Sequence, residues 1–455
     1  GTVRITSEYA GLAVEGMEFT GGSLIADGEE VGLSVAVSSK KFEISNGIIE
    51  ATGGQQAVYL GGILPDTSSY TDMKILAGES KDIAAEITSL PNTADGYKIY
   101  KYLKIYSENY EPEEKYNLWI GETQVTNKNA ANVLAGTVND GKVKFDAKTN
   151  TLTLSGANIT EKANMGVWAS VYSKLSELNI KLEGENTVGA PFDGSPGYSG
   201  DNGIYSEGTL TFVGEGTLNL NIAPEWTFAY GIGSKGLLTI GDKVTIKTDH
   251  QATAGTHEGI FAEGGLTIGG DANINLKMSG GGTIGICAAG DFKVTENAKV
   301  DIVSDLYCFY QTSTKGGFDY VQDGGKVKLL STGSYCIYAK NFDFKDGKMT
   351  AVTDYWYALF LLGDKISFSG GSAEFSGNPA IKANKDSLAT IAFEGVTVKA
   401  GDSAENAAAI KAPTNKTELE AHKYYKIEKT TVEPEKYDLW VGGIQVTSEN
   451  GSDVL

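Results

Sequence analysis

Residues 285–311 read GICAAGDFKVTENAKVDIVSDLYCFYQ, and this stretch decides the fold. It opens on a short phrase, GICA at Gly285, which returns in altered form as CFYQ at Cys308. Between about residues 202 and 382 the phrase begins eight times, at spacings of 28, 28, 26, 23, 28, 22 and 22 residues. Its second residue is always apolar and is called the anchor below: Ile204, Ile232, Ile260, Ile286, Phe309, Ile337, Leu359 and Ile381. A period of about 20 to 30 residues with tolerated insertions is typical of a solenoid.

Between consecutive anchors the chain holds two short alternating runs, as in LTIGDKVTIKT (residues 238–248) and FDFKDGKMTAVT (residues 342–353). Alternation at period two, with β-branched and aromatic residues around a Gly/Asp turn, predicts strand–turn–strand. Three strands per period leave no room for a helix, and propeller blades need about 40 to 50 residues each. The sequence therefore predicts an all-β, right-handed parallel β-helix of the pectin-lyase-like kind. Each coil would take 22–28 residues.

A second repeat has a much longer period. Residues 114–126 read EKYNLWIGETQVT, and residues 435–447, which lie 321 positions later, read EKYDLWVGGIQVT. The anchor phrase also recurs early in the chain, at Leu12, Leu33 and Val58. We therefore predict three parts: residues 1–107 close a first β-helix module, 108–431 form a complete module, and 432–455 begin a third with a cap segment.

The charge of the chain excludes some partners. The chain carries 58 acidic and 38 basic residues, a net charge of -20, and its one arginine is Arg4. Nucleic-acid binding requires clustered Lys and Arg, so we expect no nucleic-acid partner. No apolar run approaches the ~20 residues of a membrane-spanning helix, so we expect no membrane insertion by this fragment. No cofactor is predicted, although so many carboxylates could collect Ca²⁺.

Motifs for catalysis are sparse. GIGSKG (231–236) and GGGTIG (280–285) match the dinucleotide fingerprint, but both lead into β-alternation instead of a helix. His250 and His257 lie in a Gly/Thr-rich insertion, which predicts solvated loop residues. Cys308 and Cys336 hold the same position in successive coils, which favours a buried stack of thiols over a disulfide. A polysaccharide lyase or glycoside hydrolase acting on acidic plant or host glycans stays open as an alternative, because acidic residues are plentiful. We predict no catalytic residues and no metal site.

Aromatic residues form two columns at the coil spacing. One column follows the anchor directly and includes Tyr205, Phe261, Tyr310, Tyr338 and Phe360. The other lies two positions before the anchor and includes Tyr230, Tyr307, Tyr335 and Tyr357. Exposed aromatic columns suit stacking on sugar rings, so the first column is our candidate glycan-binding site. The alternative is that a column stacks internally or is covered by loops.

Residues 116–188 contain the phrases YNLWIGETQVT and NTLTL. This stretch resembles the repeated modules of large surface proteins from Gram-positive gut anaerobes, which carry an LWVGGxQVT…NTLTL pattern and are often labelled hypothetical or carbohydrate-binding. The resemblance implies an exported, surface-displayed location and supplies no catalytic residues. In such a module Trp119 and Trp440 would anchor N-terminal caps, because a solenoid must cover its open strand edge.

Taken together, these features predict a secreted or surface-displayed bacterial repeat protein. We expect it to be non-catalytic and adhesin-like or glycan-binding, with a polysaccharide or host glycan as partner. A purely structural spacer is the second alternative to glycan binding. Within its longer chain the protein is expected to be monomeric.

Overall fold

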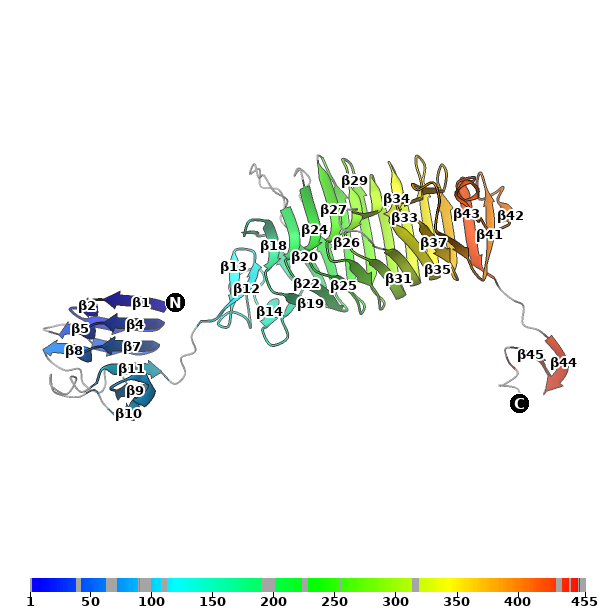
Figure 1. Cartoon of the computed structure of the whole chain (residues 1–455). Helices are drawn as coiled ribbons and strands as arrows, with labels where there is room; N and C mark the ends of the chain where they lie inside the picture. Colours follow the sequence, from blue (N-terminus) through cyan, green and yellow to red (C-terminus); the bar gives the residue numbers. More distant parts are fainter. Residues whose placement is uncertain are drawn as a thin grey trace. The chain divides into compact units, whose positions relative to one another are not determined.

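A computed structural model shows that the chain is nearly all β, with 62% of residues in strands and 2% in helices. It forms two compact units, Gly1–Glu114 and Lys115–Leu455 (Figure 1). The residues that the structure describes are 2–37, 42–62, 72–88, 90, 100–107, 113–189, 201–222, 228–253, 255–312, 319–430, 436–441, 443–448 and 450.

The first unit consists of parallel coils closed by antiparallel strands. Its coil strands are β1 (Thr2–Ser7), β2 (Ala10–Val14), β3 (Met17–Phe19), β4 (Ser23–Gly28), β5 (Val31–Val37), β6 (Phe42–Ile44), β7 (Ile48–Gly53) and β8 (Gln56–Gly62). The closing elements are β9 (Met73–Gly78), η2 (Lys81–Ile83), β10 (Ala85–Ile87) and β11 (Tyr102–Ser107). Leu12 pairs with Leu33, and Leu33 pairs with Val58, so the early anchors stack as predicted.

The second unit is a β-solenoid, and the chain as a whole makes about 12 turns. One wall is a 12-stranded sheet, which we call the anchor sheet. Its strands are β12 (Lys115–Ile120), β13 (Thr123–Thr126), β17 (Ala163–Asn164), β18 (Trp168–Ser173), β21 (Asp201–Ser206), β24 (Phe228–Ser234), β27 (Thr256–Ala262), β30 (Ile284–Ala288), β32 (Tyr307–Gln311), β34 (Tyr335–Ala339), β36 (Leu359–Leu361) and β39 (Ile381–Ala383).

The other walls form one 20-stranded sheet that bends around a corner. Its strands are β14 (Val143–Asp146), β15 (Thr151–Ser155), β16 (Asn158–Ile159), β19 (Glu177–Glu183), β20 (Glu185–Val188), β22 (Thr209–Gly214), β23 (Thr217–Leu220), β25 (Leu238–Ile240), β26 (Thr245–Gln251), β28 (Leu266–Ile268), β29 (Asn273–Ser279), β31 (Phe292–Ser304), β33 (Asp319–Ser331), β35 (Asn341–Thr353), β37 (Lys365–Phe368), β38 (Ser372–Ser376), β40 (Thr390–Phe393), β41 (Val396–Gly401), β42 (Ala408–Ile410) and β43 (Tyr424–Lys429). Most coils thus have three strands, as predicted.

Three coils differ from the predicted strand–turn–strand pattern. β31, β33 and β35 each run unbroken for 13 residues through the expected turn. In the pairing of β31 with β33, a register shift between Glu296 and Lys299 stands in place of the expected turn. A local shift of this kind bends the strand around the corner without ending its pairing.

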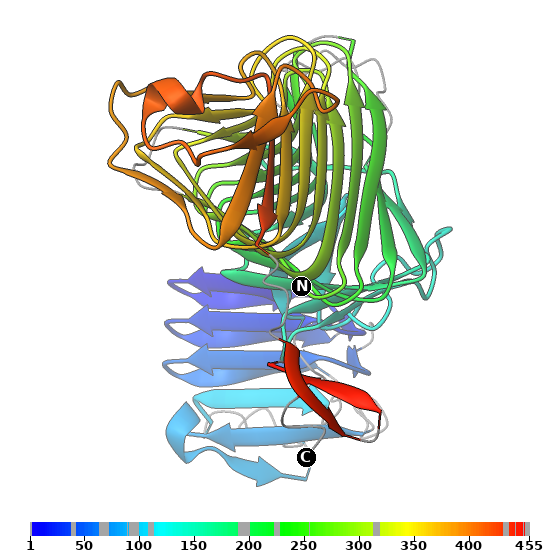
Figure 2. The ribbon, with the colours of Figure 1, turned by 90° about the vertical axis from the view of Figure 1, so that its right-hand side faces the viewer.

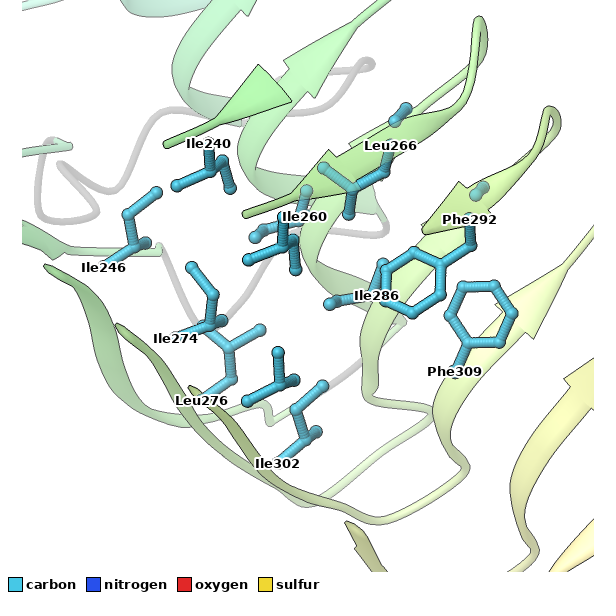
Figure 3. Close-up of a cluster of buried hydrophobic side chains, with 14 of the residues drawn as sticks. Ile240, Ile246, Ile260, Leu266, Ile274, Leu276, Ile286, Phe292, Ile302 and Phe309 are labelled. Atoms are coloured by element: carbon cyan, nitrogen blue, oxygen red, sulfur yellow. The ribbon is translucent and has the colours of Figure 1, made fainter. Parts of the chain in front are cut away.

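The anchors form the centre of the core. Each anchor pairs in register with the next, from Ile204 through to Ile381, as the period predicts. All eight are buried, with at most 1% exposure. Figure 3 shows Ile260 and Ile286 pointing into the interior that Leu276 and Ile302 also enter. Burying a side chain of this size contributes about 1.5–3 kcal/mol, so the column is a major source of stability.

Each end of the second unit is closed by irregular or antiparallel structure. At the N-terminal end β12 pairs antiparallel with β18, and Trp119 packs against Tyr172 with ring centroids 5.8 Å apart. At the C-terminal end β43 pairs antiparallel with β38 and β41, and the short helix α1 (Lys416–Leu419) lies beside them (Figure 2). These elements satisfy strand edges that would otherwise be open.

A last hairpin, β44 (Lys436–Val441) and β45 (Ile444–Thr447), repeats the form of β12 and β13. Both hairpins carry a register irregularity four residues long, ending at Trp119 and at Trp440. The predicted module boundaries involve residues 108 and 431–432, which lie outside the described ranges. The three-module frame therefore stays a prediction.

Candidate functional site

Both aromatic columns lie on the outer face of the anchor sheet, although strict alternation would place one of them inside. The reason is that two consecutive residues enter the core at each anchor. Cys308 and the anchor Phe309 are both buried in the main core, and so are Cys336 and Ile337. Two consecutive inward side chains act as a bulge, which turns the residues before and after them to the same outer side.

Six rings on three consecutive coils form a continuous patch, which we call the aromatic surface. It consists of Tyr307, Tyr310, Tyr335, Tyr338, Tyr357 and Phe360. Within one coil the ring centroids are 4.7 Å apart for Tyr307–Tyr310 and 5.7 Å apart for Tyr357–Phe360. The middle pair, Tyr335–Tyr338, is 6.0 Å apart. The two columns are therefore in direct contact across the sheet.

The rings also contact one another from coil to coil. The ring centroids of Tyr338–Phe360 and Tyr307–Tyr335 are stacked at 5.2 and 5.6 Å, and those of Tyr310–Tyr338 lie 5.0 Å apart with the planes tilted by 35°. Parallel carbon surfaces in direct contact would lie about 3.5–4.0 Å apart, so the two stacked pairs are offset. All six side chains are half-buried, so each ring keeps part of its surface uncovered.

Trp356 extends this surface at its C-terminal end, and Tyr355 precedes it in the chain. Trp356 is 48% exposed and contacts Tyr335 and Tyr357 edge-on, at 5.9 and 5.7 Å. Tyr355 is 68% exposed. Ring faces that remain this open are available to stack on a ligand.

Four phenol groups of this surface remain protonated at neutral pH. Burial raises the pKa of Tyr307, Tyr310, Tyr335 and Tyr338 above the ordinary value, because the phenolate form would lose hydration. Neighbouring tyrosines raise the pKa values of the first three further. The hydroxyl groups therefore stay able both to donate and to accept hydrogen bonds.

The aromatic surface has a defined border on each side. On the N-terminal side the next coil replaces the two rings with Ile284 and Cys287, which pair in register with Tyr307 and Tyr310. On the C-terminal side Phe360 pairs with Lys382, whose Nζ lies 2.6 Å from Glu420 Oε2. The continuous part thus covers three coils.

Two of the five predicted residues lie apart from this surface. Tyr205 is 9% exposed and stacks on Tyr172 at 6.2 Å, in a separate cluster that Trp119 also contacts. Phe261 stacks on Tyr230 at 5.0 Å, one coil before the Ile284–Cys287 border. Only Tyr310, Tyr338 and Phe360 are contiguous.

Glu258 is a shielded acid beside the aromatic surface. Its Oε2 is hidden from solvent and has no hydrogen-bond partner among the described residues. Burial raises the pKa of this carboxyl to about 8, and a hydrogen bond with Cys287 opposes the shift. Glycosidases require two carboxyl groups that face each other, whereas the group that faces Glu258 here is a thiol.

The prediction that His250 and His257 are solvated is wrong, because both side chains are buried. His250 Nε2 lies 2.7 Å from His257 Nδ1, and the rings stack at 4.9 Å. Desolvation and then the nearby His257 lower the pKa of His250 to about 4. The prediction of buried thiols is confirmed, since Cys308 and Cys336 are buried and free. The burial of the two histidines could not be predicted from the sequence, because the corner that contains them is covered only when adjacent coils stack.

The described residues offer neither a metal-binding cluster nor a membrane-spanning helix. Across the described parts of the chain, no group of three or more His, Cys, Asp or Glu side chains is arranged to hold a metal ion. Within the same ranges, no helix is long and apolar enough to cross a membrane.

The fold and this surface define a class: a β-solenoid that displays aromatic rings on one outer wall. A family model described as "Carbohydrate-binding domain-containing protein" matches residues 121–354, just over half of the chain. The chain belongs to this family. The match covers β13 to β35 and includes four of the six rings of the aromatic surface. No curated protein and no solved structure matches the chain significantly.

Proposed function

We propose that this protein binds glycans without catalysis, through the aromatic surface and Trp356. The observation that carries the proposal is that three consecutive coils each present two contacting rings on one outer wall, beside an indole that is 48% exposed. The family assignment supports the same reading. Sugars present apolar C–H faces with polar rims, and aromatic rings bordered by hydroxyl groups match both features.

Binding at such a site would be weak per ring and stronger over several rings. Contact between two aromatic rings is worth about 0.5–1.5 kcal/mol beyond area burial, and we expect a sugar on a ring to contribute on the same order. Three coils in one rigid wall supply these contacts without a large ordering cost, since the rings already stack on one another. Repetition of modules along a longer chain would raise avidity further.

We also propose that the protein works outside a bacterial cell, as part of an adhesin-like repeat array. The resemblance of residues 116–188 to surface-protein modules supports this location. Immunolabelling of intact and of permeabilised cells would test it, and labelling of permeabilised cells alone would contradict it.

The test of glycan binding compares two tryptophans of the same chain. The full chain is incubated with cellulose, xylan, mannan, mucin and polygalacturonate, and the retained fraction is measured. For a glycan that is retained, Trp356→Ala is expected to weaken binding about tenfold, equivalent to about 1.4 kcal/mol. Trp440→Ala removes an indole that is 62% exposed on the C-terminal hairpin and serves as the matched control.

Retention of Trp356→Ala equal to that of the wild type would contradict the proposal, as would equal losses in the two variants. Both substitutions remove exposed side chains, so the thermal unfolding midpoints are expected to stay close to the wild-type value. Measuring them separates loss of binding from loss of folding.

A further inference from the structure

We propose that the aromatic surface takes an extended, uncharged polysaccharide that lies along the coil axis, with one sugar ring over each of β32, β34 and β36. This inference rests on the proposed function and names the class of glycan. It follows from the spacing, width, length and charge of the surface.

The spacing comes from the stacking of the coils. Along one column the centroid distances are 5.0 and 5.2 Å, and along the other they are 5.6 and 5.4 Å. They follow the strand spacing of about 4.8 Å. A sugar in an extended β-1,4-linked chain advances the chain by a comparable distance. Successive sugars can therefore meet equivalent pairs of rings without strain.

The width also fits one sugar ring per coil. In each coil the two ring centroids lie 4.7, 6.0 or 5.7 Å apart, so one pyranose can span both. A branch on a sugar at the C-terminal end of the surface would meet the exposed Trp356, which contacts Tyr335 and Tyr357. Linear chains are thus favoured over branched ones.

The length of the surface sets the number of sugars bound. Toward the N-terminus the pattern stops at Ile284 and Cys287, which are 4% and 1% exposed. Toward the C-terminus it stops at Lys382, which is paired with Glu420. Affinity should therefore rise with chain length up to about three sugars, one per coil of the surface.

The charges near the surface favour an uncharged ligand. Lys382 continues the column, but its ammonium is neutralised by Glu420, whose Oε1 accepts a hydrogen bond from the Ala383 N–H at 3.0 Å. Asp354 lies exposed next to Tyr355. With a net charge of -20, the protein repels polyanions at long range.

The experiment titrates the full chain by calorimetry with linear series from glucose to cellohexaose, and with the xylose and mannose equivalents. In a series that binds, affinity is expected to rise about tenfold per sugar up to the trisaccharide and less than about twofold beyond the tetrasaccharide. Malto-oligosaccharides have α-1,4 links that curve the chain, so their affinity is expected to rise much less with each added sugar. Polygalacturonate is expected to bind at least about tenfold more weakly than the best uncharged chain.

Two ring-removing variants and one conservative variant test where the sugars bind. Phe360→Ala removes a ring from the end coil. In this variant the affinity should stop rising with chain length one sugar earlier than in the wild type. Tyr338→Ala removes a ring from the middle coil and should lower trisaccharide affinity about tenfold while leaving the monosaccharide nearly unchanged. Tyr338→Phe keeps the ring and should restore most of the affinity.

The outcomes separate this inference from the proposed function. Binding without length dependence in all three series, or equal affinity for polygalacturonate, overturns the inference and leaves glycan binding in place. Retention by none of the polysaccharides, with the variants folded, overturns both.

Discussion

Small residues just before the anchors let two consecutive side chains enter the core. An added Cβ at Gly285 would lie 2.3 Å from Ile302 Cγ2 and 2.7 Å from the carbonyl oxygen of Cys308. At Gly259 an added Cβ would meet the carbonyl oxygen of Gly285, also at 2.7 Å. The same position tolerates Cys308 and Cys336, because the neighbouring core there leaves room for a small thiol. This local packing turns the aromatic rings outward.

Replacement of Gly285 by alanine should destabilise the second unit by about 1–3 kcal/mol, because the new methyl group meets backbone and a β-branched side chain in a packed core. Gly241→Ala is the matched control, since an added Cβ there has no neighbour within 4 Å. The measurement is the urea midpoint of each variant. Equal midpoints for the two variants would show that the coil at Gly285 relaxes freely.

At the scale of elements, the corner between β26 and β27 contains the buried histidine pair. His250 is the last residue but one of β26 and His257 is the second residue of β27, and both side chains are buried. Their ring nitrogens share one hydrogen bond at 2.7 Å, which requires at least one neutral imidazole. The corner is therefore sensitive to acid.

The pH dependence follows from the pKa of His250, which burial and the nearby His257 lower from 6.5 to about 4. The folded state favours the neutral form of His250. The full contribution of His250 to the free energy of unfolding is therefore present above pH 6.5. Between pH 6.5 and 4 the unfolded chain binds the extra proton, and up to about 3 kcal/mol is lost as the pH falls. Thermal midpoints of the wild type and His250→Gln should therefore converge toward pH 4. His422→Gln, at a half-buried position, is the control, and parallel curves for His250→Gln and the wild type would contradict the expectation.

At the scale of the whole molecule, the two units have separate cores. The core of the second unit includes residues from Leu118 to Ile427, and that of the first includes residues from Leu24 to Ile105. The two similar hairpins differ in packing: Leu118 is fully buried in the second unit, whereas its counterpart Leu439 is 49% exposed. The predicted frame, in which the second hairpin begins another module, stays a prediction.

A fragment spanning residues 114–431 should therefore fold alone and unfold in one cooperative step. Its buried core is complete without the first unit and without the last hairpin. Its urea midpoint should match that of the second unit in the full chain. Insolubility of the fragment, or a midpoint clearly below that value, would show that the predicted module frame is wrong.

Much of the architecture could be predicted because it is repeated locally. The period of the anchor phrase predicted the pairing of Ile204 with Ile232 and onward to Ile381, and period-two alternation predicted most strands. The unbroken strands β31, β33 and β35 were not predicted, because the same Gly/Asp residues that form a free turn can also form a bulge within a paired strand.

The candidate site was predicted in part. The sequence by itself determined which aromatic residues recur at the coil spacing, including Tyr310, Tyr338 and Phe360. Only the tertiary structure decided that Tyr307, Tyr335 and Tyr357 share their outer face, and that Tyr205 lies under the N-terminal hairpin. Only stacking of the coils buried His250 and His257. The physical reason is that alternation is a property of one strand, whereas the face that follows a bulge depends on its register with neighbouring coils.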